Sequence, residues 1–125
     1  MKRPEEALHR AVIQYLAWVK PRALYFHCPN GEARSKATGG RLKAMGTLPG
    51  VADLLFVCED GRIKFIELKA EGKYLSPAQK AFKETVTALG ADYAVARSVD
   101  DVAETLCAWG LVAHRAALNG QGRAA

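Results

Sequence analysis

The residues of this chain that could do chemistry flank two short apolar runs near its middle. Asp53 stands just before the run 54–58, and Glu67 and Lys69 interrupt the end of a second run that begins at Ile63. Charged side chains rarely lie in central strands unless they pair or bind something. Carboxylate oxygens suit Mg²⁺, and a divalent ion held by one or two carboxylates can promote phosphodiester hydrolysis. A lysine beside them can orient water and neutralise charge developing on phosphate. The alternative is a salt bridge at the strand ends, and spacing alone does not decide.

The register of a predicted β-hairpin determines whether the two carboxylates meet. The apolar runs are joined by Glu59-Asp60-Gly61, which is typical of a hairpin loop. With a turn of two residues, Asp53 faces Leu68, and Glu67 lies on the other face of the sheet unless a bulge restores the pairing. With a loop of three residues that ends in a left-handed Gly61, Asp53 lies opposite Glu67. The sequence permits both registers, and the second builds a carboxylate pair directly.

Hydrophobic periodicity and turn residues predict the elements that position these groups. Apolar residues recur every three or four positions over 5–19, which predicts an amphipathic helix. Ser76-Pro77 supplies a helix N-cap and a first-position proline, and Gly90 stands where that helix would end. We also expect strands at 23–27 and 93–97, a helix around 35–44, and a last helix from Ser98. The sequence thus predicts an α/β layered domain with a small mixed sheet flanked by helices.

The charge of the chain permits a polyanionic partner. Eighteen Lys and Arg residues against thirteen Asp and Glu give a formal net charge of +5. Between Lys20 and Lys43 the basic residues are opposed by Glu32 alone, so we expect one strongly basic face. An ordinary solvated surface is the alternative interpretation of any single one of these cations.

Length and composition narrow the class of protein. The 125 residues fit one domain, which we place at 1–115 with a flexible tail at 116–125. The longest apolar runs fall far below the roughly 18 residues of a membrane span, and the acidic pair at 5–6 does not suit a signal peptide. We therefore expect a cytoplasmic protein. Three widely spaced cysteines predict reduced thiols, buried at Cys58 and Cys107, with no disulfide scaffold or zinc site.

Three ordered motifs resemble a known family. They are Gly50-Val51-Ala52-Asp53, then Phe65-Ile66-Glu67-Leu68-Lys69, then Leu75-Ser76-Pro77-Ala78-Gln79. Together they are similar to the VRR-NUC branch of the PD-(D/E)XK nuclease superfamily, in particular to its short stand-alone proteins of phages and prophages. The resemblance runs from an acid in the first helix, through 27–31 and 33–36, to about Asp101. It departs from the family at Ala52, where proline is usual.

The resemblance implies a restriction-endonuclease-like core and a Mg²⁺- or Mn²⁺-dependent endonuclease. It implies that Asp53 and Glu67 bind the metal, that the Leu68 carbonyl adds a main-chain ligand, and that Lys69 assists the attacking water. It also implies a glutamate of the first helix at the site, where Glu5 matches better than the adjacent Glu6, although the sequence leaves both open. Gln79 matches the family's glutamine at this place, and a solvated helix residue is the equal alternative.

The resemblance also gives the basic stretch a role in binding DNA in a bacterial cell or phage-infected host. The residues expected to contact DNA are His27, Asn30, Arg34, Lys36, Arg41 and Lys43. Stand-alone members resemble Holliday junction resolving enzymes, so we expect a homodimer that acts on branched DNA, a four-way junction above all. The alternatives are a flap, fork or other endonuclease with the same core, and a non-catalytic module that binds branched DNA.

Overall fold

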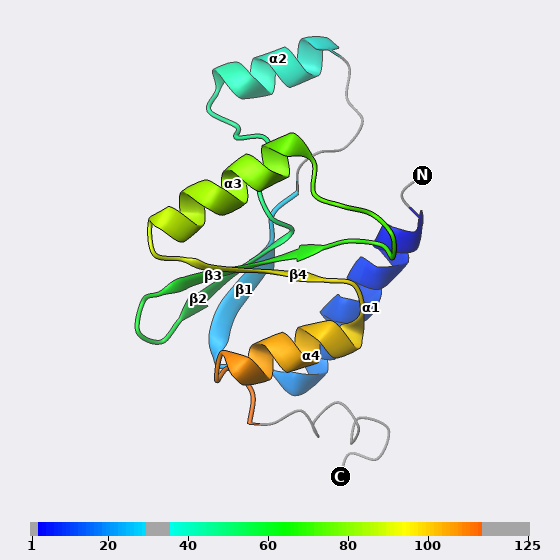
Figure 1. Cartoon of the computed structure of the whole chain (residues 1–125), viewed down its shortest axis with the longest axis vertical. Coiled ribbons are helices and arrows are strands. Elements are labelled where there is room, and N and C mark those ends of the chain that lie inside the picture. The colour runs from blue at the N-terminus through cyan, green and yellow to red at the C-terminus, as the bar shows by residue number, and fades with distance from the viewer. Residues whose placement is uncertain (1–2, 30–35, 114–125) are drawn as a thin grey trace.

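The fold is a four-stranded mixed sheet between two layers of helices (Figure 1). The computed structural model describes residues 3–29 and 36–113. The elements are α1 (Arg3–Val19), β1 (Ala23–His27), α2 (Lys36–Ala44), β2 (Leu54–Cys58), β3 (Ile63–Leu68), α3 (Pro77–Ala88), β4 (Asp92–Ala96) and α4 (Val99–Ala108). The strand order is β1-β2-β3-β4, with antiparallel pairing except between β3 and β4, which run parallel. The predicted α/β fold is confirmed. The predicted tail at 116–125 lies outside the described residues.

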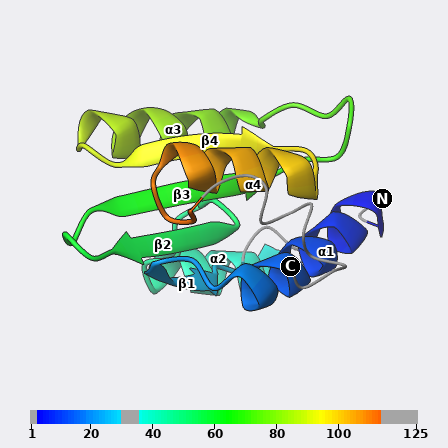
Figure 2. The ribbon, with the colours of Figure 1, turned by 90° about the horizontal axis from the view of Figure 1, so that it is seen from below.

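Two apolar clusters hold the layers together. The larger cluster packs α1 and α4 on one face of the sheet, with Leu16, Ile66 and Leu106 among its fully buried side chains. The smaller cluster packs α3 on the other face through Phe82, which meets Phe65 edge to face at 5.0 Å between ring centroids. Figure 1 shows α3 on one side of the sheet with α1 and α4 on the other, and Figure 2 shows α1 and α4 in front of the strands.

The β2–β3 hairpin adopts the register that brings the carboxylates together. Leu54 pairs with Ile66 and Val57 with Ile63, and one further step sets Asp53 opposite Glu67. The loop has three residues, because the Cys58 N–H donates to the Arg62 carbonyl at 2.9 Å. Its last residue, Gly61, has a φ of +84°, a conformation that glycine adopts without strain. The two-residue turn that the sequence also permitted is therefore not the one formed.

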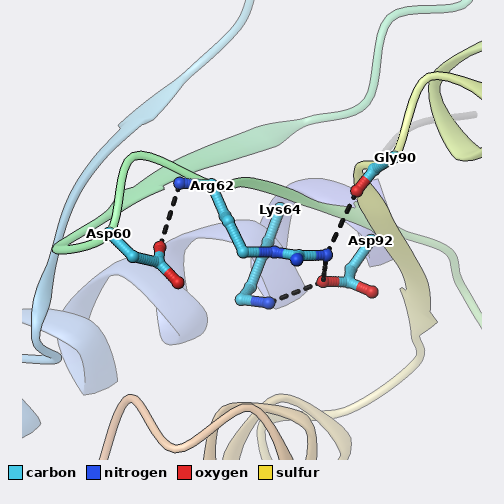
Figure 3. Close-up of polar contacts among 5 residues, drawn as sticks. All are labelled: Asp60, Arg62, Lys64, Gly90 and Asp92. Atoms are coloured by element: carbon cyan, nitrogen blue, oxygen red, sulfur yellow. Dashed lines mark hydrogen bonds and ion pairs between the residues drawn. The ribbon is translucent and has the colours of Figure 1, made fainter.

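A network of charged side chains closes the hairpin end of the sheet (Figure 3). The Lys64 ammonium donates to the Asp92 carboxylate at 2.6 Å, which joins β3 to the start of β4. The Arg62 guanidinium donates to the Gly90 carbonyl at 3.3 Å and lies 4.0 Å from the same carboxylate. The Arg62 N–H donates to the side chain of Asp60 at 3.0 Å. At this end both cations of the network, Arg62 and Lys64, lie beside the Asp92 carboxylate.

Two remaining expectations concern cysteines and membranes. Cys28, Cys58 and Cys107 form no disulfide within the described residues, and Cys58 and Cys107, which were expected to be buried, are only half-buried. Cys58 is the last residue of β2, and Cys107 lies near the end of α4. Both side chains pack against the larger apolar cluster from its margin. None of the described helices has the length and apolar character needed to cross a membrane.

Candidate active site

Two carboxylates meet at the end of the sheet opposite the hairpin. Asp53 precedes β2, and its Oδ2 accepts a hydrogen bond of 2.8 Å from the Leu68 N–H. Glu67, in β3, is only 3% exposed. Burial, and then the charge of Asp53, raise the pKa of Glu67 to about 8. Burial also raises the pKa of Asp53, against the opposing effect of the Leu68 hydrogen bond. The fold thus holds together two carboxyl groups that repel each other when both are ionised.

The two oxygens of Glu67 have different surroundings. Oε2 accepts a hydrogen bond of 2.9 Å from the Gln79 side-chain amide. Oε1 is buried and has no hydrogen-bond partner of good geometry among the described residues, although the nearby Asp53 main-chain N–H lowers the pKa of Glu67. A buried carboxylate oxygen without a donor is costly. Oε1 is therefore the atom from which a bound cation would remove the largest penalty.

Gln79 is oriented by the helix that carries it. Ser76 and Gln79 form a capping box at the start of α3: the Gln79 N–H donates to Ser76 Oγ at 3.2 Å, and Gln79 Oε1 accepts from the Ser76 N–H at 2.8 Å. Because Gln79 Oε1 accepts the hydrogen bond from Ser76, the side-chain NH₂ group of Gln79 points away from Ser76 and donates to Glu67. The capping box thus accounts both for the N-cap that was predicted at Ser76 and for the approach of Gln79 to the carboxylates.

The first helix brings Glu5 to the site and leaves Glu6 outside it. Glu5 Oε2 accepts a hydrogen bond of 3.2 Å from the Ala70 N–H, two residues beyond the end of β3. Glu6 is exposed and pairs with Arg10 at 3.5 Å on the same helix. The structure therefore places Glu5 beside the carboxylates, and its part in the chemistry stays a prediction.

Two histidines adjoin Asp53. His27 Nδ1 lies 3.1 Å from the Asp53 carbonyl oxygen, and since a carbonyl only accepts, this nitrogen carries the proton of the hydrogen bond. The His9 ring meets the His27 ring edge to face at 4.3 Å. Burial, and then the charge of His27, lower the pKa of His9, while Asp53 raises it. Sequence reasoning missed His9 as a neighbour of the site, although it lies one helical turn after Glu5 and so on the same face.

Gly50 allows the segment before β2 to pack against the start of α3. Its φ is +82°, and a Cβ atom there would lie 2.3 Å from the Ala78 carbonyl oxygen. No other residue type fits so close an approach without movement. Ala52, two residues on, is fully buried against Phe65 and Phe82. This contact of two main chains fixes Asp53 relative to the helix that carries Gln79.

The other predicted residues differ in how far the structure places them. Lys69 is half-buried directly after β3, and its charge lowers the pKa of Glu67. The side chain of Leu68 is in the core, and its main chain adjoins Asp53. Arg41 and Lys43 are exposed on the last turn of α2. A cavity of about 520 Å³ between α2 and α3 is lined by Lys43 and Gln79, among others.

Three predicted DNA contacts are not described at the level of side chains. Asn30 and Arg34 lie outside the described residues, and of Lys36 only the main chain, at the start of α2, is described. Over 3–29 and 36–113, no three side chains of His, Cys, Asp or Glu form a group that could hold a metal ion. A metal site here would have to combine the carboxylate pair with main-chain or water oxygens.

The sheet and its helical layers define a restriction-endonuclease-like fold. Two solved structures share it: a VRR_NUC domain protein with a TM-score of 0.67 and 24% identity, over 87% of this chain and 90% of that one, and a VRR_NUC domain with a TM-score of 0.56 and 22% identity, over 82% and 94%. The sequence profile of the VRR-NUC domain family matches residues 5–100, and the chain belongs to this family. Among curated proteins, none matches it. The chain is therefore a nuclease-type DNA-processing domain.

Proposed function

We propose that this protein is a Mg²⁺- or Mn²⁺-dependent endonuclease that cuts branched DNA. The observation that carries the proposal is the pairing of half-buried Asp53 with buried Glu67, two acids that repel each other when both are ionised, with Glu67 Oε1 lacking a hydrogen bond of good geometry among the described residues. A pair of carboxylates on the solvent-exposed surface would be hydrated and would not carry this cost of burial. A divalent cation would neutralise both acids at once, and this supports a metal site over a purely structural role.

The donor set fits a hard divalent ion. Asp53, Glu67 and the Leu68 carbonyl would hold it, and the rest of its coordination would come from water and substrate oxygens. When bound, the ion would supply Lewis acidity and an activated water for attack on phosphorus. Two carboxylates and few other side-chain donors are typical of Mg²⁺ sites, whereas zinc sites use His and Cys.

The surrounding side chains have distinct roles in this proposal. Lys69 orients the attacking water and stabilises the negative charge that develops on the phosphate. Gln79 holds Glu67 Oε2 at 2.9 Å and so keeps Oε1 free. Glu5 fixes the chain beyond β3 through Ala70, which positions the neighbouring Lys69.

DNA contacts would extend from this site toward α2. His27 is exposed beside Asp53, and Arg41 and Lys43 are exposed on α2. Each phosphate contact by a lysine or arginine would make binding weaker as salt rises. Lys43 and Gln79 line one cavity, so a strand that passes through it would reach both a cation and the side chain that donates to Glu67.

The preferred substrate in this proposal is a four-way junction, cut by a homodimer. One chain carries one carboxylate site, and resolution of a junction requires two symmetric cuts, which a two-fold dimer provides. Flap or fork cleavage by the same core is the second candidate. A non-catalytic DNA-binding module is disfavoured, because buried acids repel phosphate and serve no purpose in a binder.

The test is cleavage of a labelled four-way junction, beside flap and linear duplexes, in Mg²⁺, Mn²⁺ or EDTA. We expect symmetric nicks in the junction that require metal and vanish in Asp53→Ala. Cleavage of the flap alone would favour the second candidate. Tight junction binding with no cleavage in either metal would contradict the proposed enzyme.

A further inference from the structure

The connection between β3 and α3 is tied to the site at both of its ends. At residue 70, the Ala70 N–H donates to Glu5 at 3.2 Å. At residue 76, Ser76 orients Gln79, which donates to Glu67 at 2.9 Å. Figure 1 shows this connection at the end of the sheet where α1 begins. The side chains that it presents to solvent therefore lie at the same end of the sheet as the carboxylate site.

This connection presents an aromatic ring to solvent. Tyr74 is 79% exposed, more than the other exposed aromatic side chains, Trp18 and Phe26. Single exposed apolar residues are common and need no explanation by themselves. Tyr74 differs because its ring is held in place from one side.

Arg97 supports the Tyr74 ring. The guanidinium carbon lies 5.6 Å from the ring centroid, at cation–π distance. The same guanidinium donates to the Ala70 carbonyl at 2.8 Å, and the Arg97 N–H donates to Asp101 at 2.8 Å. Arg97 thus joins the ring to the residue that Glu5 holds. One face of Tyr74 is backed by a cation, and the large exposed fraction leaves the other face open.

We propose that Tyr74 stacks on an unpaired nucleobase beside the phosphate that is cut. The inference rests on the proposed function and narrows its substrate to branched DNA in which a nucleotide at the cleavage point is unpaired or becomes unpaired when the protein binds. An aromatic face backed by a guanidinium stacks with bases of any sequence. Lys73, next to Tyr74 in the connection, can bind the adjoining phosphate, although Glu71 is also part of it. Paired bases in a continuous duplex would have no free face to offer.

The experiment compares a blunt duplex with the same duplex carrying a short single-stranded extension. The first unpaired position holds 2-aminopurine, whose fluorescence falls when it stacks on an aromatic ring. Ca²⁺ replaces Mg²⁺ so that binding is measured without cleavage. We expect the wild-type protein to quench the probe. We expect Tyr74→Ala to abolish the quenching and to weaken binding of the extended duplex by about tenfold, as the loss of one stacked base does, with no change for the blunt duplex.

Three variants separate stacking from other effects. Tyr74→Phe keeps the ring and should behave as the wild type. Lys73→Ala should weaken both DNAs alike, because a phosphate contact does not read pairing. Leu89→Ala, at another highly exposed position beyond the far end of α3, should change neither. Equal binding of both DNAs by Tyr74→Ala and the wild type, or an equal loss for both, would overturn the inference.

The outcome is independent of whether the protein cuts DNA. Quenching that depends on Tyr74, without cleavage in Mg²⁺ or Mn²⁺, would support base binding and contradict the proposed enzyme. Cleavage that does not depend on Tyr74 for either DNA would support the enzyme and contradict only this inference.

Discussion

The two ends of strand β3 treat charge in opposite ways. At the hairpin end, Lys64 pairs with Asp92 at 2.6 Å and Arg62 lies beside the same carboxylate. At the other end, Glu67 faces Asp53, a group of the same sign, and is almost fully buried. Both ends thus bury or partly bury charge, but among the described residues an ion pair forms at the first end and not between Asp53 or Glu67 and a cation at the second. The comparison is consistent with a stabilising role for the first end and supports the proposal that the second end receives a cation.

The largest effect is expected from Lys69→Ala. Because the lysine acts on charge that develops in the transition state, its loss should lower kcat by roughly 10²- to 10³-fold and leave DNA and metal affinity largely unchanged. Single-turnover cleavage measures the rate, and Mn²⁺ titration measures the metal affinity. A variant that cleaves as fast as the wild type would remove Lys69 from the account.

Gly50→Ala tests whether the contact between Gly50 and α3 holds together the end of the sheet that carries Asp53 and Glu67, which we call the acid end. The new Cβ would meet the Ala78 carbonyl, and the φ of +82° disfavours any residue but glycine. We expect a loss of more than about 1 kcal/mol in the free energy of unfolding. Urea denaturation measures it, with Gly72→Ala as a matched control of positive φ that has open space around it. Equal losses for both variants would show that backbone conformation, and not the contact with α3, decides.

The acid end should also make stability depend on pH when metal is absent. The pKa of Glu67 is about 8 in the folded chain, above its ordinary value of 4.5, so the folded state binds more protons between these pH values. Stability must then fall as pH rises through this window. In EDTA, we expect the Tm of the wild type to decrease from pH 5 to pH 8 more steeply than that of Glu67→Gln. Parallel curves for the two proteins would contradict a raised pKa.

The smallest effect is expected at the paired end. Asp92→Asn leaves Lys64 near a neutral amide, and because Asp92 is partly exposed the cost should be about 1 kcal/mol of stability. Cleavage should not change. Thermal melts measure the stability, and the junction assay measures cleavage. A large loss of cleavage in a folded Asp92→Asn protein would contradict the separate roles of the two ends of β3.

The sequence predicted the elements and the small mixed sheet because periodicity and caps are local signals. It left the hairpin register open, since the main-chain conformation of Gly61 decides between loops of two and three residues. It also left Glu5 and Glu6 open, because only the contact with Ala70, made by a distant part of the chain, separates two adjacent helical residues. The approach of His9 and the Lys64–Asp92 pair depend on how elements pack, and so neither was predicted.

The most direct test of the account is calorimetric titration of Mn²⁺ into the wild type, Glu67→Gln and Asp92→Asn. The account predicts a binding site in the wild type that is lost in Glu67→Gln and kept in Asp92→Asn. Equal Mn²⁺ binding by the wild type and Glu67→Gln, or none by any of the three, would contradict the claim that the carboxylate pair exists to receive a cation.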